Sequence, residues 1–477
     1  MKTPSVDLLV IGAGTAGMPC AMEAAAAGAS VQVIEKANEV GGALWFSGGQ
    51  MSAAGTRRQR AMGIEDKAED HYADVLRMGG EPMDKSLVRR ATELAPKTVD
   101  WLEDLGFPFD PSCPALVPEH EHYSAPRTYW GPEAGISILK TLRPTWEQLV
   151  AEGAIQLQLG SRVVELETQA DRVTGAVVEH QDGSQQRIRA AATVLTTGGY
   201  AANPEVFAAL TPVAPPLVTH SPETSTGDAI DLTRGLGAEV RNCDTYVTAL
   251  GGFRTETGPG RIRDWRDGWA LVGSARMRAP REIYVASDGR RFINEDETGN
   301  DLRDHAIGQL DRELFWVVFD EAALWAGECL IMGWENEDIV TAAATGEFCW
   351  RADTIADLAN LAGLDPTGLS SSVAEYNEGV ERGTDRLGRQ VPDYPLTTPP
   401  FYAFRMQGCS ILSWAGLTVN DQLQVLDERA QPIGGLYAAG EVLGMAATSG
   451  SAVVSGMSVT PAMSFGRWLG KRLAPQT

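Results

Sequence analysis

The sequence lacks the features that would mark an exported, metal-binding or nucleic-acid-binding protein. Its six cysteines contain no C-x-x-C pair and do not cluster with the six histidines, so we expect free thiols, no metal site and a cytoplasmic protein. Only 40 lysines and arginines stand against 63 aspartates and glutamates, a net charge of -23, which makes nucleic acid and anionic membrane surfaces poor partners. No apolar run is long enough for a signal sequence or a spanning helix, so we expect no membrane insertion.

Glycine is the residue present in excess, at 51 of 477 residues or about 11%, against an average of roughly 7%. The first glycines form the pattern G-x-G-x-x-G at Gly12, Gly14 and Gly17, directly after an apolar stretch, residues 6–11, that predicts a buried strand. In such a motif the first glycine permits a tight turn, the second lets the backbone approach a pyrophosphate, and the third lets a helix pack on the strand.

The residues that follow this motif complete a βαβ unit. A helical pattern covers residues 18–27, and a second strand over residues 30–34 leads to Glu35, whose carboxylate can accept hydrogen bonds from a ribose diol. Because strand, helix, second strand and terminal acid are in register, the sequence predicts a Rossmann-like dinucleotide-binding domain.

Further glycine motifs follow this unit in a fixed order. A Gly-Gly pair and a Ser-Gly-Gly turn come after Glu35, and Thr-Thr-Gly-Gly-Tyr follows an apolar strand over residues 192–195. In this order the chain resembles the flavoproteins of the fumarate reductase and succinate dehydrogenase superfamily, which also contains the 3-ketosteroid dehydrogenases. The resemblance implies an α/β protein with a Rossmann-like FAD-binding domain and an inserted α+β capping domain. The motifs that carry it are residues 41–42, 47–51, 196–200, 226–228, 289–295 and 435–441.

Together, the first glycine motif and the resemblance predict one FAD site. A helix is expected to open at residues 456–459, and its free N–H groups suit an isoalloxazine oxygen that gains negative charge on reduction. No histidine lies between Gly41 and Arg60, where members that bind FAD covalently carry theirs, so we expect noncovalent FAD. The cofactor residues that we expect are Gly12, Gly14, Thr15, Ala16, Gly17, Glu35, Lys36, Gly41, Gly42, Ser47, Gly48, Gly49, Val163, Thr197, Gly198, Gly199, Asp228, Gly440, Glu441, Ser458 and Val459.

The domain organisation that we expect is discontinuous. Residues 1–241 form the first part of the FAD-binding domain, residues 242–395 form the capping domain, and residues 396–477 form the second part of the FAD-binding domain. Residues 399–404 resemble the strand by which the family's chain returns to that domain. No second glycine motif follows a strand, so a built-in NAD(P)H module is not expected, and electrons must pass to or from an external acceptor or donor.

The substrate pocket decides which reaction a member of this superfamily performs, since the flavin can remove or add two hydrogens at adjacent carbons. Fumarate reductases bind their dicarboxylate with a set of cationic side chains. By gapless counting these positions fall on or close to Gly299, Leu412, Ala249 and Val453, none of which is charged. Because two buried carboxylates without partners would be costly, a dicarboxylate substrate is disfavoured.

The ketosteroid branch is more similar to this chain. The segment around Tyr123 and Tyr129 resembles the region where that branch carries one active-site tyrosine, and Gly456 falls where a backbone N–H holds the substrate ketone. Two other tyrosines of that branch would fall on Ala452 and Gly299. We therefore expect a relative of these enzymes with a rebuilt pocket.

The loop over residues 445–454 is small and apolar with hydroxyls, which suits a neutral ring that carries one hydrogen-bond acceptor. We predict an FAD-dependent oxidoreductase that desaturates a cyclic ketone, such as a cyclohexanone derivative or a 3-ketosteroid, with hydride to flavin N5 and the α-proton to a protein base. Tyr123, Tyr129 and Tyr246 are candidate donors or bases. Arg127 could lower the pKa of a tyrosine or clamp a carbonyl.

A reductase is the alternative that the sequence leaves open. In this hypothesis the protein is an ene-reductase or enoate reductase of the fumarate or urocanate type, and Arg127 or Arg303 binds a single carboxylate. The two hypotheses differ in thermodynamic direction, which the flavin potential and the electron partner set.

Overall fold

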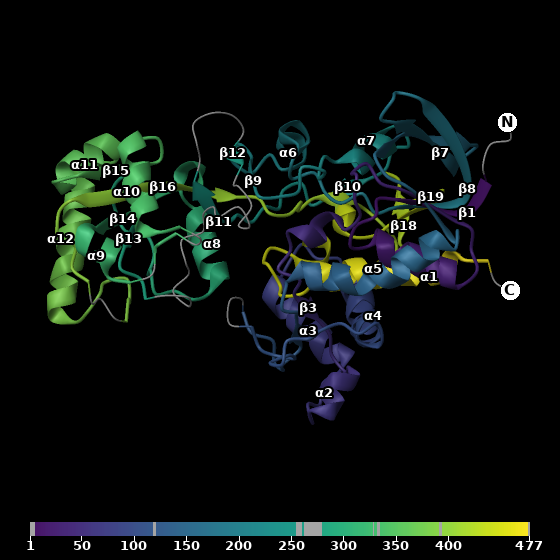
Figure 1. The fold of residues 1–477 in the computed structure, drawn as a ribbon, viewed down its shortest axis with the longest axis horizontal. Coiled ribbons are helices and arrows are strands. Elements are labelled where there is room, and N and C mark those ends of the chain that lie inside the picture. The colour runs from purple at the N-terminus through teal and green to yellow at the C-terminus, as the bar shows by residue number, and fades with distance from the viewer. Residues whose placement is uncertain are drawn as a thin grey trace. The chain divides into compact units, whose positions relative to one another are not determined.

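The chain forms two compact units (Figure 1). The computed structural model describes residues 5–117, 121–253, 260–261, 279–327, 329–331, 334–390 and 394–475. The first unit comprises Met1–Val213, Ser221–Tyr246 and Leu412–Thr477, and the second comprises Ala214–His220 and Val247–Ile411.

A largely parallel sheet forms the centre of the first unit. Its strands follow the order β18-β19-β7-β8-β1-β2-β5, and β6 pairs with β7. β1 lies between β8 and β2 and is parallel to both. Its residues Leu8, Leu9 and Val10 are completely buried, because a central parallel strand is covered on both faces. The strands are β1 (Ser5–Ile11), β2 (Val31–Ile34), β5 (Ile155–Gln158), β6 (Ser161–Gln169), β7 (Arg172–His180), β8 (Gln185–Leu195), β18 (Gln424–Leu426) and β19 (Pro432–Ala438).

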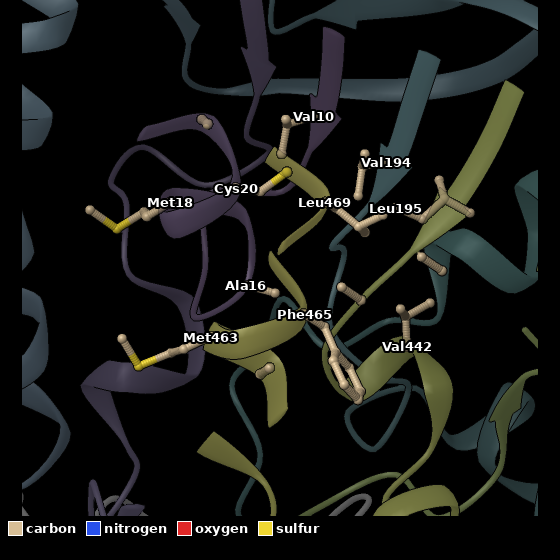
Figure 2. Close-up of a cluster of buried hydrophobic side chains, with 14 of the residues drawn as sticks. Val10, Ala16, Met18, Cys20, Val194, Leu195, Val442, Met463, Phe465 and Leu469 are labelled. Atoms are coloured by element: carbon tan, nitrogen blue, oxygen red, sulfur yellow. The ribbon is translucent and has the colours of Figure 1, made fainter. Parts of the chain in front are cut away.

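Two helices from opposite ends of the chain pack against each other in this unit. α1 (Gly17–Ala26) begins within the first glycine motif, and α14 (Val459–Leu473) lies near the C-terminus. Their backbones approach closely, because a Cβ atom added at Gly466 would lie 2.1 Å from the carbonyl oxygen of Ala16. Figure 2 shows apolar side chains of both helices meeting those of β1 and β8 in one core, which fixes the glycine motif against the C-terminal helix.

Further elements complete the first unit. β3 pairs with β4 in antiparallel fashion, so that Ser52 lies opposite Thr128. A capping box formed by Thr56 and Gln59 starts α2, and the Asp84 side chain accepts two backbone N–H groups at the start of α4, as is typical of stable helix N-termini. These elements are β3 (Met51–Ser52), α2 (Arg57–Ala61), α3 (Ala68–Gly79), α4 (Lys85–Asp104), β4 (Thr128–Tyr129), α5 (Gly135–Ala151), α6 (Pro204–Leu210), α7 (Asp228–Arg234), β10 (Val240–Arg241), β17 (Gly416–Leu417) and α13 (Ala446–Ser449).

The second unit is built on a five-stranded sheet in the order β11-β16-β14-β13, with β15 paired to β16. Side chains of β14 alternate between two apolar clusters, with Val317 and Phe319 in one and Trp316 and Val318 in the other. Helices therefore pack on both faces of this sheet. The elements are β9 (Val218–Thr219), β11 (Ala249–Phe253), β12 (Gly260–Arg261), β13 (Ile283–Val285), α8 (Asn300–Gly308), β14 (Leu314–Asp320), α9 (Glu321–Trp325), α10 (Asn336–Thr345), β15 (Cys349–Ala352), α11 (Ile355–Ala362), α12 (Pro366–Arg382) and β16 (Phe401–Cys409).

The strand that we expected to lead back into the FAD-binding domain lies in the second unit. β16 pairs with β14 along the whole length of that strand, from Gln407 opposite Leu314 to Phe401 opposite Asp320. Its first four residues are buried, because β16 has neighbours on both edges and helices over the sheet. The chain returns to the first unit at Leu412.

Among the described residues, no helix combines the length and the apolar character needed to cross a membrane. The same part of the chain holds no group of three or more His, Cys, Asp or Glu side chains placed to bind a metal ion. All six cysteines are free thiols.

Candidate active site

The first glycine motif forms a tight loop between β1 and α1. Gly12 has a φ of 103°, and a Cβ added there would lie 2.4 Å from the carbonyl oxygen of Thr196. A Cβ at Gly17 would lie 1.9 Å from the carbonyl oxygen of Gly12, so neither position accepts a side chain. At Gly14 the nearest atom to an added Cβ is 3.9 Å away, which leaves this side of the loop open for a ligand.

This open side of the loop presents unused hydrogen-bond donors. The backbone N–H groups of Gly14, Thr15 and Ala16 have no acceptor among the described residues. They precede α1, whose N-terminus adds a partial positive charge. Unused N–H groups at a helix start bind phosphate oxygens well, so the loop fits the pyrophosphate of a dinucleotide.

Glu35 lies at the end of β2 and is held in place through both carboxylate oxygens. One oxygen accepts the Ala13 N–H at 2.7 Å and the other accepts the Ala37 N–H at 2.8 Å. The residue is 8% exposed. Since a carboxylate has about four lone-pair sites, Glu35 keeps the capacity to accept hydrogen bonds from a ribose.

A second glycine pair lies against the first motif. The Gly41 N–H donates to the Ala13 carbonyl at 2.9 Å, and a Cβ added at Gly42 would lie 3.2 Å from the Gly14 Cα. The turn at Ser47–Gly49 is closed by its serine hydroxyl, which accepts the N–H of its last glycine at 3.0 Å. The close approach to Gly14 and a φ of 51° explain why position 42 is glycine.

Two of the expected cofactor residues bind each other. Lys36 Nζ lies 3.0 Å from Asp228, and Arg162 lies 3.0 Å from the other oxygen of the same carboxylate. Burial alone would raise the pKa of Asp228, but these cations and the Thr226 hydroxyl hold it below its usual range. This cluster ties the end of β2 to the start of α7, and the adjacent Val163 is buried in β6.

Thr197, Gly198 and Gly199 follow β8. Because β8 is parallel to β1, they lie at the same edge of the sheet as the first glycine motif. The Thr197 hydroxyl is buried and has no hydrogen-bond partner in the described part of the chain, as expected of a group that awaits a ligand. A Cβ at Gly199 would lie 2.3 Å from a carboxylate oxygen of Glu441. That oxygen accepts the Ser413 N–H at 2.9 Å, and burial raises the pKa of Glu441.

A small pocket opens beside Glu441. Its lining includes one carboxylate and no cation, and Gly440, Met445, Thr448 and Ser458 contribute to it. A carboxylate among small and apolar groups can accept hydrogen bonds from the neutral hydroxyls of a ribityl chain.

The segment that enters α14 presents further unused donors. The backbone N–H groups of Gly456, Ser458 and Val459 have no acceptor within the described residues. Gly456 has a φ of 77°, and a Cβ added there would lie 2.3 Å from the Ser52 nitrogen. Oriented N–H groups of this kind stabilise an oxygen that gains negative charge.

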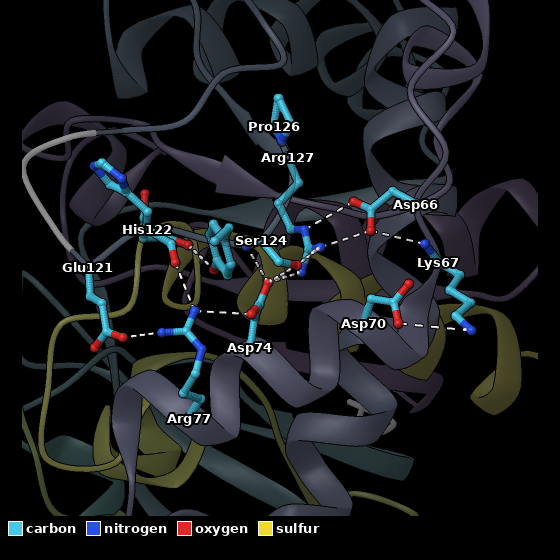
Figure 3. A network of polar contacts seen from close by, with 12 residues as sticks. Asp66, Lys67, Asp70, Asp74, Arg77, Glu121, His122, Ser124, Pro126 and Arg127 are labelled. Atoms are coloured by element: carbon cyan, nitrogen blue, oxygen red, sulfur yellow. Dashed lines mark hydrogen bonds and ion pairs between the residues drawn. The ribbon is translucent and has the colours of Figure 1, made fainter.

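Arg127 is completely buried and its charge is already paired (Figure 3). Its guanidinium lies 2.8 Å from Asp66 and 3.0 Å from Asp74, and Asp74 also accepts the Ser124 N–H and hydroxyl at 2.7 and 2.6 Å. An arginine held by two carboxylates has no charge left for a substrate carboxylate. We therefore assign Arg127 a structural role, in place of the carbonyl clamp or carboxylate binder that we had considered.

The three candidate tyrosines differ in their surroundings. Tyr123 donates to the Ser455 carbonyl at 2.6 Å, and the Tyr129 hydroxyl lies 2.7 Å from the Thr56 hydroxyl. Burial raises the pKa of both Tyr123 and Tyr129, and for Tyr123 it outweighs the charge of Arg127. A tyrosine that acts as a base needs a lowered pKa, so these raised pKa values disfavour that role for both residues. Tyr246, at the end of a segment of the first unit, is half-buried, and its ring packs edge-on against Phe207 with centroids 5.9 Å apart.

Comparison with known proteins identifies the family. A family model described as "FAD binding domain" matches residues 7–458. The chain belongs to this family. A probable fumarate reductase from Shewanella frigidimarina is 31% identical over 98% of this chain and 75% of the relative. A 4-oxocyclohex-2-ene-1-carboxylate 5-dehydrogenase from Sinomonas cyclohexanicum is 25% identical over 92% and 89% of the two chains.

The fold of this FAD-binding protein is that of a 3-ketosteroid Δ1-dehydrogenase from Sterolibacterium denitrificans, with a TM-score of 0.78, 21% identity and 99% of each chain covered. The protein is an FAD-dependent oxidoreductase. The loop after β1, the unpartnered Thr197 hydroxyl and the free N–H groups before α14 are all consistent with FAD as the cofactor.

Replacement of Glu35 by arginine is expected to weaken FAD binding about ten- to hundredfold, because a hydrogen bond to a charged group contributes about 1.5–3 kcal/mol. The measurement is the flavin absorbance that the protein retains on a desalting column. Glu39→Arg is the matched control, since Glu39 is exposed four positions further along. Equal flavin retention in the two variants would contradict this placement of the nucleotide.

Sequence reasoning missed the residues that hold the candidate site together. Asp66 is 61 positions from its partner Arg127, and Ser413 is 28 positions from its partner Glu441. No local pattern signals these contacts. The sequence pointed to Thr197 as a cofactor residue because it lies in a recognisable glycine motif.

Proposed function

We propose that the protein removes two hydrogens from adjacent carbons of a cyclic ketone, such as a cyclohexanone derivative or a 3-ketosteroid. The observation that carries this proposal is the unaccepted N–H of Gly456 within a stretch, residues 445–459, that has no charged side chain. A carbonyl oxygen is a neutral acceptor that such a donor can hold, whereas a carboxylate there would lack a cation.

The Gly456 N–H donates to the carbonyl oxygen of the substrate in this proposal. Withdrawal of charge to that oxygen makes the α-carbon proton more acidic, and the phenolate form of Tyr246 accepts this proton and becomes a neutral phenol. Tyr246 is the one of the three candidate tyrosines that is half-buried. The hydrogen on the β-carbon leaves with its electron pair, so that a carbon–carbon double bond forms next to the carbonyl. FAD, when bound, supplies the two-electron acceptor.

Two relatives support this choice to different degrees. The Sinomonas protein is named as a dehydrogenase of a ring that carries an oxo group, which matches the class of substrate proposed here. The ketosteroid enzyme supports the fold alone, at 21% identity.

Reduction of an unsaturated monocarboxylate is the second candidate function, and Arg303 favours it. Arg303 lies on α8 of the second unit and is 6% exposed. It donates to the Asn300 side chain, and its Nε has no hydrogen-bond partner among the described residues. A buried guanidinium with an unused donor can bind a carboxylate, and the Shewanella relative is named as a probable fumarate reductase.

Turnover of an α-deuterated cyclohexanone with an external electron acceptor tests the proposed function. We expect an unsaturated ketone that has lost one α-deuterium and one β-hydrogen, as measured by mass spectrometry, and slower turnover than with the unlabelled ketone. Absence of this product with cyclohexanones and with 3-ketosteroids would reject the proposal.

A further inference from the structure

Tyr123 is bonded to the same peptide group that presents the Gly456 N–H. Its hydroxyl donates to the Ser455 carbonyl oxygen at 2.6 Å, and that oxygen and the Gly456 N–H are the two ends of one peptide unit. A hydrogen bond accepted by the oxygen of a peptide polarises the unit and makes its N–H a stronger donor. Tyr123 can therefore act on a substrate that it does not touch.

The Tyr123 side chain is held rigidly for this contact. It is 4% exposed, and the Arg127 guanidinium lies 5.1 Å from its ring centroid. The His71 ring meets it edge-on with centroids 5.4 Å apart. Since burial raises the pKa of Tyr123, its hydroxyl stays protonated at neutral pH and donates. Arg127 is itself held by Asp66 and Asp74, so its contact with the Tyr123 ring limits the movement of that ring.

The peptide on the other side of this hydrogen bond is also fixed. Gly456 has a φ of 77° and packs over the Ser52 nitrogen, and the Ser455 hydroxyl donates to the Gln50 side chain at 2.8 Å. The Gly456 N–H itself has no acceptor among the described residues. The donor is thus oriented and unused.

We propose that Tyr123 is a positioning residue that orients and polarises the Ser455–Gly456 peptide, so that the Gly456 N–H holds the developing negative charge on the substrate's carbonyl oxygen. This inference rests on the proposed function. It replaces the role of proton acceptor that the sequence allowed for Tyr123 with a role as a permanent donor.

The test uses the FAD-loaded protein and a para-substituted phenol, whose phenolate oxygen resembles the oxygen of an enolate. We expect the wild-type protein to lower the pKa of the bound phenol, measured from phenolate absorbance across pH. In Tyr123→Phe this pKa is expected to rise by about 0.5 unit or more, and kcat with a ketone to fall about three- to tenfold with little change in KM, as for the loss of one hydrogen bond.

A second substitution reverses the sign of the effect. Replacement of Tyr123 by 3-fluorotyrosine keeps the ring and makes the hydroxyl a stronger donor, so the pKa of the bound phenol is expected to fall below the wild-type value. Tyr402→Phe is the matched control, because it removes a hydroxyl bond of 2.7 Å, to Glu321, from the second unit and leaves the phenol unaffected. A purely structural role would not produce shifts of opposite sign.

The outcomes separate this inference from the proposed function. If wild-type protein oxidises a ketone and lowers the phenol pKa, but both Tyr123 variants match it, the positioning role is overturned and the proposed function stands. If wild-type protein neither oxidises a ketone nor lowers the phenol pKa, the proposed function fails and the inference fails with it.

Discussion

Tyr246→Phe is expected to lower kcat for ketone oxidation by about 10²- to 10⁴-fold, the range typical for loss of a general base. The phenyl ring keeps the edge-on contact with Phe207, whose centroid lies 5.9 Å away, so the fold and the KM are expected to change little. The loss arises because the phenolate oxygen that accepts the α-proton is gone. Stopped-flow measurement of flavin reduction isolates this step from later ones.

Tyr437→Phe provides the control for that experiment. Tyr437 is another half-buried tyrosine of the first unit, on β19, and its variant is expected to reduce flavin at the wild-type rate. A Tyr246→Phe rate within a few-fold of wild type would remove Tyr246 as the proton acceptor.

Arg127→Leu is expected to lower the free energy of unfolding by about 3–5 kcal/mol, because removal of one partner leaves buried charges unpaired. The arginine is completely buried, and so is Asp66 at 1% side-chain exposure. Urea denaturation followed by fluorescence measures the change. The variant is expected to weaken catalysis only through the altered position of Tyr123.

Neutralisation of the partners distinguishes this explanation from a loss of packing. Adding Asp66→Asn to Arg127→Leu removes the carboxylate that has lost its cation and is expected to restore part of the lost stability, whereas Asp74 keeps its ion pair with Arg77 at 3.0 Å. If Arg127→Leu is as stable as wild type, or if the added substitution destabilises the protein further, the buried ion pair does not have the role assigned to it.

The glycine loop between β1 and α1 was predictable from the sequence because its determinants are local. Gly12 and Gly17 are required by contacts within one βαβ unit, where an added Cβ would lie 2.4 and 1.9 Å from backbone oxygens. Such short-range requirements leave a fixed spacing of residues in the sequence. The predicted strand over residues 6–11 and helix over 18–27 correspond closely to β1 (Ser5–Ile11) and α1 (Gly17–Ala26).

The chemistry on the substrate side was less predictable because it depends on contacts between distant segments. Arg127 was a candidate for lowering a tyrosine pKa, but its pairing with Asp66 and Asp74 could not be inferred from spacing. The depth of burial of Tyr123, which raises its pKa, depends likewise on helices and loops far along the chain. Residues 399–404 lie in the second unit, because β16 pairs with β14 along the whole length of β14.

Anaerobic mixing of the FAD-loaded protein with a panel of cyclohexanones and 3-ketosteroids tests the central claim most directly. The proposed function predicts that a saturated ketone bleaches the oxidised flavin band, and the ketone that does so shows the ring size. The contrary result is a band that no ketone bleaches, together with reoxidation of the dithionite-reduced protein by an unsaturated acid; this result would make the protein a reductase.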